Sequence, residues 1–295
     1  MKNIIDLHSH TTKSDGTFTP DELLIQAENN NLEMLSITDH ESVEAYYSFN
    51  RSLFSGLIIP GLELRTTCFG IAIEILAYGF DLDKMRETLK KYDYKTTEEL
   101  DKYMIKLAYE QYTKRNVLLD KSFVQDYDPQ KHPRLSKYIQ SCISKYSEND
   151  VFLKDLPEGK SFFRCCITNP NSPLFLDLSS AFPSIGELID AIKSANGLVA
   201  IPHIFEYREN AEKILIHLLE NYDIDIIECY YPSFSQEQTN YLLEICEKYN
   251  KFSSGGSDFH GSLRPDIFLG SGKDNNLFVP KEKIEKWINL LKNKL

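Results

Sequence analysis

Short apolar runs that alternate with amphipathic helical patterns constrain the fold of this chain most. The runs have the length and composition of buried strands, and they lie at 4–7, 34–37, 57–59, 71–76, 198–201, 224–227 and 252–254. The helical patterns lie at 184–196, 206–222, 235–249 and 280–293, and in a helix that begins at Pro20 after the N-cap Thr19. Strands that alternate with helices predict a parallel sheet. In a chain of 295 residues they favour a closed or nearly closed α/β barrel.

One long stretch breaks this alternation. Residues 84–180 are rich in Lys, Tyr and Glu, have the pattern of several helices, and end in a loop that contains Asn169-Pro-Asn-Ser-Pro. We therefore predict a barrel domain made of 1–83 and 181–295. The stretch 84–180 is expected to be an inserted, mostly helical subdomain.

The charge and cysteine content limit the partners of the protein. A net charge of −11 repels polyanions, so we expect no long nucleic acid, whereas a small phosphorylated substrate can bind where metal ions reverse the charge locally. Six scattered cysteines without metal-finger spacing, and no apparent export signal or membrane-spanning run, predict a cytoplasmic protein that does not bind membranes. The sequence does not reveal the oligomeric state.

Histidines mark the ends of the predicted strands. Five of the seven histidines come at or just after a strand end, where α/β barrels place their sites: His8, His10, His40, His203 and His260. His8 and His10 are two residues apart, so in extended backbone both rings project to the same face and can share one ion. Asp15 follows in a turn that can fold back over this strand end, although Asp before Gly is also ordinary turn chemistry.

Carboxylates accompany the next two strand ends. Asp39 and His40 close the second strand as Ile-Thr-Asp-His, which places a nitrogen ligand beside a carboxylate that either ligates or orients a ligand. Glu63 is expected just beyond the third strand, flanked by apolar residues among which an unpaired carboxylate would be costly. A metal ion or a buried cation is therefore expected at Glu63.

The later strands end in similar residues. His203 follows Leu-Val-Ala-Ile-Pro, and Asp258 and His260 repeat the two-residue spacing that aims both side chains in one direction. A set rich in oxygen and imidazole ligands, without thiolates, suits Mn²⁺, Fe²⁺ or Zn²⁺ in a hydrolytic site. Since the candidates exceed the four ligands that saturate a structural zinc ion, we predict two or more ions with open positions.

These motifs follow one another in a distinctive order. They read His8-Ser-His10, Ser-Asp15-Gly, Thr-Asp-His40, Pro-Gly-Leu-Glu63, Pro-His203 and Gly-Ser-Asp258-Phe-His260-Gly. In this order they resemble the PHP (polymerase and histidinol phosphatase) family, from residue 3 to about 272 except for the insert. The resemblance implies a distorted seven-stranded (β/α)7 TIM-like barrel that binds two or three divalent ions and hydrolyses phosphoesters. The insert most resembles the branch that acts on nucleoside monophosphates or short nucleotides.

The resemblance also implies ligand groups that share Glu63. The groups are His8, His10, Glu63 and Asp258; Glu63 with His203; and Asp15, His40 and His260. Where many relatives carry a histidine before Leu-Gly-Tyr, this chain has Glu74, which can still ligate and favours a harder ion such as Mn²⁺. The alternative is that Glu74 faces solvent from an edge strand.

The ligand set leads to a hypothesis for the mechanism. A hydroxide activated by the ions would attack phosphorus in line with the leaving alkoxide, which Asp39, His260 or a metal-bound water would protonate. Arg134, Arg208 and Arg264 are candidates to bind the substrate phosphate, although each could be an ordinary surface arginine.

The sequence thus predicts a metal-dependent phosphoesterase that hydrolyses a small phosphomonoester or a nucleotide. One alternative stays within hydrolysis, as a histidinol-phosphate phosphatase or an exonuclease on short oligonucleotides. Another alternative is an inactive module that holds metal and serves to bind a partner.

Overall fold

The computed structural model describes residues 4–92, 94–132, 134–154, 156 and 161–292. The chain forms two compact units. The larger comprises Met1–Arg65, Glu74–Tyr92 and Ile185–Leu295, and the smaller comprises Thr66–Ile73 and Asp93–Ser184. Most of the smaller unit falls within the predicted insert at 84–180, whose limits stay a prediction.

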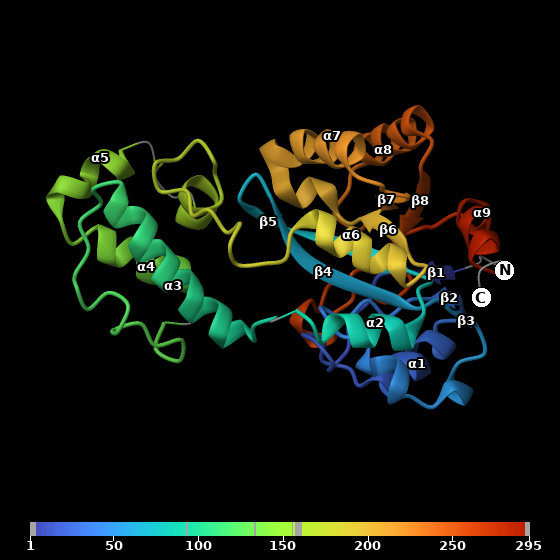
Figure 1. Cartoon of the computed structure of the whole chain (residues 1–295). Helices are drawn as coiled ribbons and strands as arrows, with labels where there is room; N and C mark the ends of the chain where they lie inside the picture. Colours follow the sequence, from blue (N-terminus) through green and yellow to red (C-terminus); the bar gives the residue numbers. More distant parts are fainter. Residues whose placement is uncertain (1–3, 93, 133, 155, 157–160, 293–295) are drawn as a thin grey trace. The chain divides into compact units, whose positions relative to one another are not determined.

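The strands form two sheets (Figure 1). The first contains the parallel strands β1 (Ile4–Asp6), β2 (Leu32–Leu35) and β3 (Leu57–Ile58). The second follows the order β4 (Gly61–Cys68), β5 (Ile71–Tyr78), β6 (Leu198–Ile201), β7 (Ile226–Tyr230) and β8 (Phe252–Gly255). Within it, β5 and β6 are antiparallel, whereas β6, β7 and β8 are parallel.

Strand β4 was absent from the strands predicted from the sequence. Glu63 lies inside this strand rather than just beyond a strand, so that part of the prediction was wrong. The reason is local, because β4 reads Gly-Leu-Glu-Leu-Arg-Thr-Thr-Cys, and its polar residues end the apolar run. The structure buries Glu63 all the same, with 1% of its surface exposed.

The two sheets are joined at their edges. Leu7 donates its backbone N–H to Gly255 (3.1 Å), and Asp258 donates to the carbonyl of His8 (2.8 Å). Isolated bridges also pair Ser9 with Phe259 and His40 with Glu63. The α/β class is confirmed. Among the described residues, however, the strands form sheets of three and five strands, and we find no continuous closed barrel of seven.

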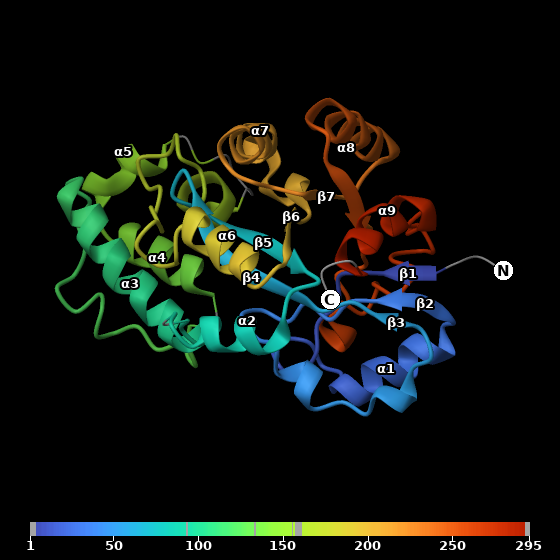
Figure 2. The same cartoon turned by 45° about the vertical axis from the view of Figure 1, so that its right-hand side comes forward.

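Helices surround the strands of the larger unit. They are α1 (Pro20–Asn29), α2 (Leu82–Leu89), α6 (Ile185–Ser194), α7 (Ala211–Asn221), α8 (Gln236–Tyr249) and α9 (Lys281–Lys292). Figures 1 and 2 show α1 on one side of the strands and α7 and α8 on the other. The start of α1 is confirmed, with Thr19 and Glu22 forming a capping box. Helix α7 begins later than predicted, because 204–210 form 3₁₀ turns with a kink at Arg208.

Apolar packing closes the amino ends of the strands. Leu198 and Ile226, which begin β6 and β7, belong to a buried cluster with Trp287 of α9. The indole Nε1 of Trp287 also donates a hydrogen bond to the carbonyl of Ser253 (3.2 Å). The candidate ligands His8, His203 and Asp258 come after the opposite, carboxyl ends of β1, β6 and β8.

The smaller unit has a core of its own. Its helices are α3 (Thr97–Lys114), α4 (Leu135–Ile143) and α5 (Asp150–Leu153). Buried side chains of these and neighbouring segments, among them Ile105, Tyr112, Phe123 and Ile139, pack into one apolar cluster. In the part of the chain that the structure describes, no helix is long and apolar enough to cross a membrane.

Candidate metal centre

The strands of the larger unit and the loops that follow them bring all nine predicted ligands together. Their nitrogen and oxygen atoms form four groups, within each of which the atoms lie no more than 4.8 Å apart. The groups are His10, Asp15, His40 and His260; His8, His10 and Glu63; His8, His203 and Asp258; and His40, Glu63 and Glu74. Because several residues belong to two groups, the groups form one connected cluster, which we call the ligand cluster.

The spacing within the ligand cluster fits shared cations. His10 Nε2 lies 3.3 Å from Glu63 Oε2 and 3.3 Å from Asp258 Oδ1, and it is buried without a hydrogen-bond partner. Two ligands bound to one ion at about 2.0–2.2 Å lie roughly 3.0–3.5 Å apart. Since a buried nitrogen rarely stays without a partner, these side chains fit a metal ion between them. Nδ1 of His40 and of His203 are also buried without hydrogen-bond partners.

Glu63 is the centre of the ligand cluster. Its Oε2 lies 3.3 Å from Nε2 of His8 and 3.4 Å from Nδ1 of His40, and its Oε1 lies 3.0 Å from Nε2 of His203. Burial alone would raise the pKa of Glu63, but the facing histidines hold this pKa well below its usual range. A carboxylate with histidines at both oxygens is suited to bridge two ions.

The raised pKa values of the histidines show that the neighbouring carboxylates stabilise positive charge. Burial by itself lowers the pKa of a histidine, yet Glu63 and Asp258 outweigh it and raise the pKa of His10 to about 10. Hydrogen bonding to Glu63 likewise raises the pKa of His203 to about 9 against the effect of burial. The carboxylates therefore stabilise positive charge at these side chains, as a site for divalent ions requires.

Asp15 and Glu74 complete the edges of the ligand cluster. Asp15 is half exposed, and its Oδ2 lies 3.4 Å from Nε2 of His260. Glu74 Oε2 lies 3.4 Å from Nε2 of His203. Burial and the like charge of Glu63 raise the pKa of Glu74, which is typical of a carboxylate inside a site. These contacts favour the ligand alternative for Glu74 over the solvent-facing one.

Glu228 holds two of the ligands and was missed by the sequence reasoning. This fully buried carboxylate contacts Nδ1 of His8 (3.0 Å) and accepts the backbone N–H of His203 (2.7 Å). The Nδ1 proton that this contact implies leaves Nε2 of His8 free to face Glu63 and Asp258. The signal in the sequence was a glutamate inside the apolar strand Ile-Ile-Glu-Cys-Tyr.

Asp6 has a related position beneath His8. It is fully buried, and it accepts backbone N–H groups from His8 (3.3 Å), Ser257 (2.8 Å) and Gly270 (2.7 Å). Burial raises its pKa to about 6, against these hydrogen bonds. Asp6 thus connects the first strand to the segment that carries Asp258. An aspartate in Ile-Ile-Asp-Leu was its sequence signal.

Asp39 has the contacts of a residue that orients its neighbours. Its Oδ1 accepts the backbone N–H of Thr11 (2.6 Å) and the hydroxyl of Ser14 (2.7 Å), and its Oδ2 accepts the hydroxyl of Thr11 (2.6 Å). These bonds hold the loop that leads to Asp15. The orienting alternative is therefore favoured over the ligand alternative, and the proton-transfer role of Asp39 stays a prediction.

The three predicted arginines lie in different surroundings. The guanidinium of Arg264 contacts Asp258 Oδ2, and burial is outweighed by this carboxylate, which raises the pKa of Arg264 further. Arg208 is exposed and has a strained backbone, with φ 53° and ψ −122°. Arg134 is exposed in the smaller unit, where it precedes α4. Phosphate binding by each of them stays a prediction.

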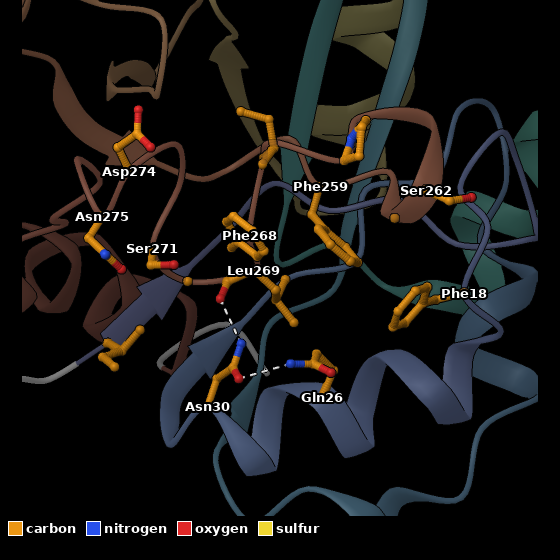
Figure 3. A pocket seen from close by; sticks show the side chains of 15 residues that line it. Phe18, Gln26, Asn30, Phe259, Ser262, Phe268, Leu269, Ser271, Asp274 and Asn275 are labelled. Atoms are coloured by element: carbon orange, nitrogen blue, oxygen red, sulfur yellow. Dashed lines mark hydrogen bonds between the residues drawn. The ribbon is translucent and has the colours of Figure 1, made fainter.

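Two of the cavities in the larger unit are lined by candidate ligands or by their neighbours along the chain. One, of about 390 Å³, is lined by Glu74, His203 and Asp258 of the ligand cluster. The other, of about 900 Å³, lies between α1 and the 259–275 segment and is shown in Figure 3. Its lining includes Phe259 and Phe268 but no lysine, arginine or candidate ligand, so it does not suit a phosphate.

A comparison with protein families identifies the family of this chain. The model of the PHP domain matches residues 6–199. The chain belongs to the PHP domain family. Family membership and the ligand cluster together confirm the predicted class, a metal-dependent phosphoesterase and hence a hydrolase.

Curated relatives match along most of their length. A protein of Escherichia coli named 5'-3' exoribonuclease Rnm is 26% identical, over 90% of this chain and 88% of the relative. A protein of Eggerthella lenta named phosphoribosyl 1,2-cyclic phosphate 1,2-diphosphodiesterase is 21% identical, over 88% of this chain and 95% of the relative.

Solved structures share the fold. A presumed metal-dependent phosphoesterase from Bifidobacterium adolescentis has a TM-score of 0.60 at 20% identity, over 96% of this chain and 95% of that one. An amidohydrolase from Chromobacterium violaceum has a TM-score of 0.58 at 18% identity, over 97% and 96%. At these identities the likeness concerns the fold alone.

Proposed function

We propose that this PHP enzyme removes nucleotides from the 5′ end of short single-stranded RNA, with two or three divalent ions as cofactors. The observation that carries the proposal is the ligand cluster, in which Glu63 lies within 3.4 Å of histidine nitrogens on both of its oxygens. The choice of RNA is supported by the relatives named 5'-3' exoribonuclease, which align with about nine-tenths of the chain, insert included.

The proposed ligands are the nine residues of the ligand cluster. They are His8, His10, Asp15, His40, Glu63, Glu74, His203, Asp258 and His260. When bound, divalent ions lower the pKa of a water molecule and offset the charge that develops on a phosphoryl group. We propose Mn²⁺, Fe²⁺ or Zn²⁺, with Mn²⁺ favoured where Glu74 replaces an imidazole.

The residues around the ligand cluster prepare it for this chemistry. His260 Nδ1 lies 2.8 Å from the carbonyl oxygen of Asp258, which can only accept a hydrogen bond. Nδ1 of His260 therefore carries the proton, and the lone pair of Nε2 faces Asp15. This arrangement supports His260 as a ligand more than as the acid that protonates the leaving group.

Two further predictions belong to this proposal. The hydrogen bond from Leu7, just after β1, to Gly255 of β8 and those that Glu63 makes with the backbone of Asp39 and Glu41 support treating the two sheets as one distorted PHP barrel. The six cysteines are free thiols, which supports a cytoplasmic location.

The charge of the chain favours a second candidate function. A net charge of −11 opposes binding of long polyanions, so the substrate could instead be a nucleoside monophosphate or another small phosphomonoester. Binding of long nucleic acid stays predicted to be absent under either function.

A substrate panel tests the proposal. The protein is stripped of metal with a chelator, reloaded with Mn²⁺, and given a 5′-phosphorylated RNA pentamer labelled at its 3′ end, AMP, a nucleoside 3′,5′-bisphosphate and histidinol phosphate. We expect stepwise shortening of the pentamer from its 5′ end, which stops when metal is removed. Phosphate release from the monoesters alone would support the second candidate. Bound metal without turnover of any substrate would overturn both and favour the inactive binding module.

A further inference from the structure

The cavity beside the ligand cluster has a second wall made of aromatic side chains. Besides Glu74, His203 and Asp258, the residues that line its 390 Å³ include Tyr207 and Tyr231. The ring of Tyr231 lies 5.6 Å from the ring of His203, between centroids. Small-molecule sites occupy roughly 300–1,000 Å³, so this cavity has room for about one nucleotide next to the ligands.

Contacts on several sides hold Tyr231 in place at the wall of this cavity. Its hydroxyl donates a hydrogen bond to Oδ2 of Asp258 (2.8 Å). Phe234 packs against its ring at 5.1 Å, and Phe205 packs edge-on against Phe234, also at 5.1 Å. A ring fixed in this way loses little conformational entropy when a ligand stacks on it.

The charges around the cavity indicate which part of a nucleotide can bind beside its aromatic wall. The carboxylates Glu74, Glu206, Asp258 and Asp266 outnumber the two cations in the lining, Arg264 and Lys273. Both cations are already paired, Arg264 with Asp258 and Lys273 with Asp266. A phosphate would be repelled here except next to bound metal ions, whereas an uncharged aromatic ring is not.

We propose that this cavity is a nucleoside subsite in which the 5′-terminal base of the substrate stacks on Tyr231 while its phosphate reaches the ligand cluster. The inference rests on the proposed function and adds to it the group that the enzyme recognises. Stacking on an aromatic face depends little on which base is present. The subsite therefore selects nucleotides over sugar phosphates without selecting one base.

A pair of matched substrates tests the subsite. One is a 5′-phosphorylated RNA pentamer, and the other is the same pentamer with an abasic ribose at its 5′ end. The Mn²⁺-loaded wild type should show a kcat/KM about tenfold or more higher on the intact pentamer. Tyr231→Leu should reduce this ratio toward one, and Tyr231→Phe should keep it because the ring remains. Phe278→Leu, an exposed position outside the cavity lining, serves as the control.

The outcomes separate the subsite from the proposed function. Equal turnover of both pentamers by the wild type, or an unchanged ratio in Tyr231→Leu, would overturn the subsite and leave the exoribonuclease proposal intact. If neither pentamer is turned over, the proposed function fails, and calorimetry of AMP against ribose 5-phosphate on the Mn²⁺-loaded protein tests the subsite alone. Equal affinities for these two compounds would overturn it. Should Tyr231→Leu fail to fold, the wild-type ratios decide.

Discussion

Two layers of acidic side chains at the strand ends differ in what their oxygens contact. In the upper layer, Glu63 and Asp258 face imidazole nitrogens across distances of 3.0–3.5 Å. In the lower layer, Asp6, Asp39 and Glu228 accept backbone N–H groups from segments that carry the ligands, and Glu228 also contacts Nδ1 of His8, the ring nitrogen that does not face Glu63. Both layers are buried, and burial alone does not separate a ligand from the residue that holds it. The groups that each carboxylate oxygen contacts do separate the two.

The largest effect is expected from His10→Ala, because Nε2 of His10 lies 3.3 Å from both carboxylates of the upper layer. Because His10 belongs to two of the four ligand groups, its loss should reduce kcat/KM by more than about a hundredfold, beyond the range known for outer-shell partners. Steady-state kinetics and elemental analysis of bound metal measure the effect. Activity that survives while metal is lost would show that the upper layer does not work through metal.

A smaller effect is expected in the lower layer, from Glu228→Gln. The amide keeps one acceptor oxygen but cannot satisfy both Nδ1–H of His8 and the N–H of His203 as the carboxylate does. We expect metal affinity to fall roughly 10- to 100-fold, with activity restored in part by excess Mn²⁺. Titration of metal-free protein with Mn²⁺ measures this. A Mn²⁺ affinity equal to that of the wild type would contradict the role of Glu228 in holding His8 and His203.

The smallest effect on metal is expected from Asp39→Ala, which should act on stability. The change leaves the buried N–H of Thr11 without its acceptor, at a cost of about 1–3 kcal/mol in the free energy of unfolding. Urea unfolding of the metal-free protein measures the loss. Glu87→Gln, which removes an exposed carboxylate paired with Lys90, is the control and should leave the midpoint unchanged. Equal midpoints for both variants would contradict the role assigned to Asp39.

The ligand residues could be predicted from the sequence because their positions after the strands depend on nearby residues alone. His8 and His10 share one ligand group, as extended backbone with two-residue spacing predicts, whereas Asp258 has a left-handed backbone (φ 56°) and lies in a different group from His260. The same logic failed at β4, where the polar side chains of a buried strand concealed its pattern. It failed again at Glu228, since the contact of Glu228 with His8 joins residues that are 220 positions apart.

By itself, the sequence determined the chemistry of this protein: which side chains stand at the strand ends, and therefore a metal-dependent phosphoesterase of the PHP family. Only the tertiary structure decided which carboxylates face the imidazoles and which hold the backbone beneath them. It also brought Tyr231 beside His203. The physical reason is that residue type and spacing follow from the local backbone, whereas the partner of each buried oxygen depends on which distant strands pack together.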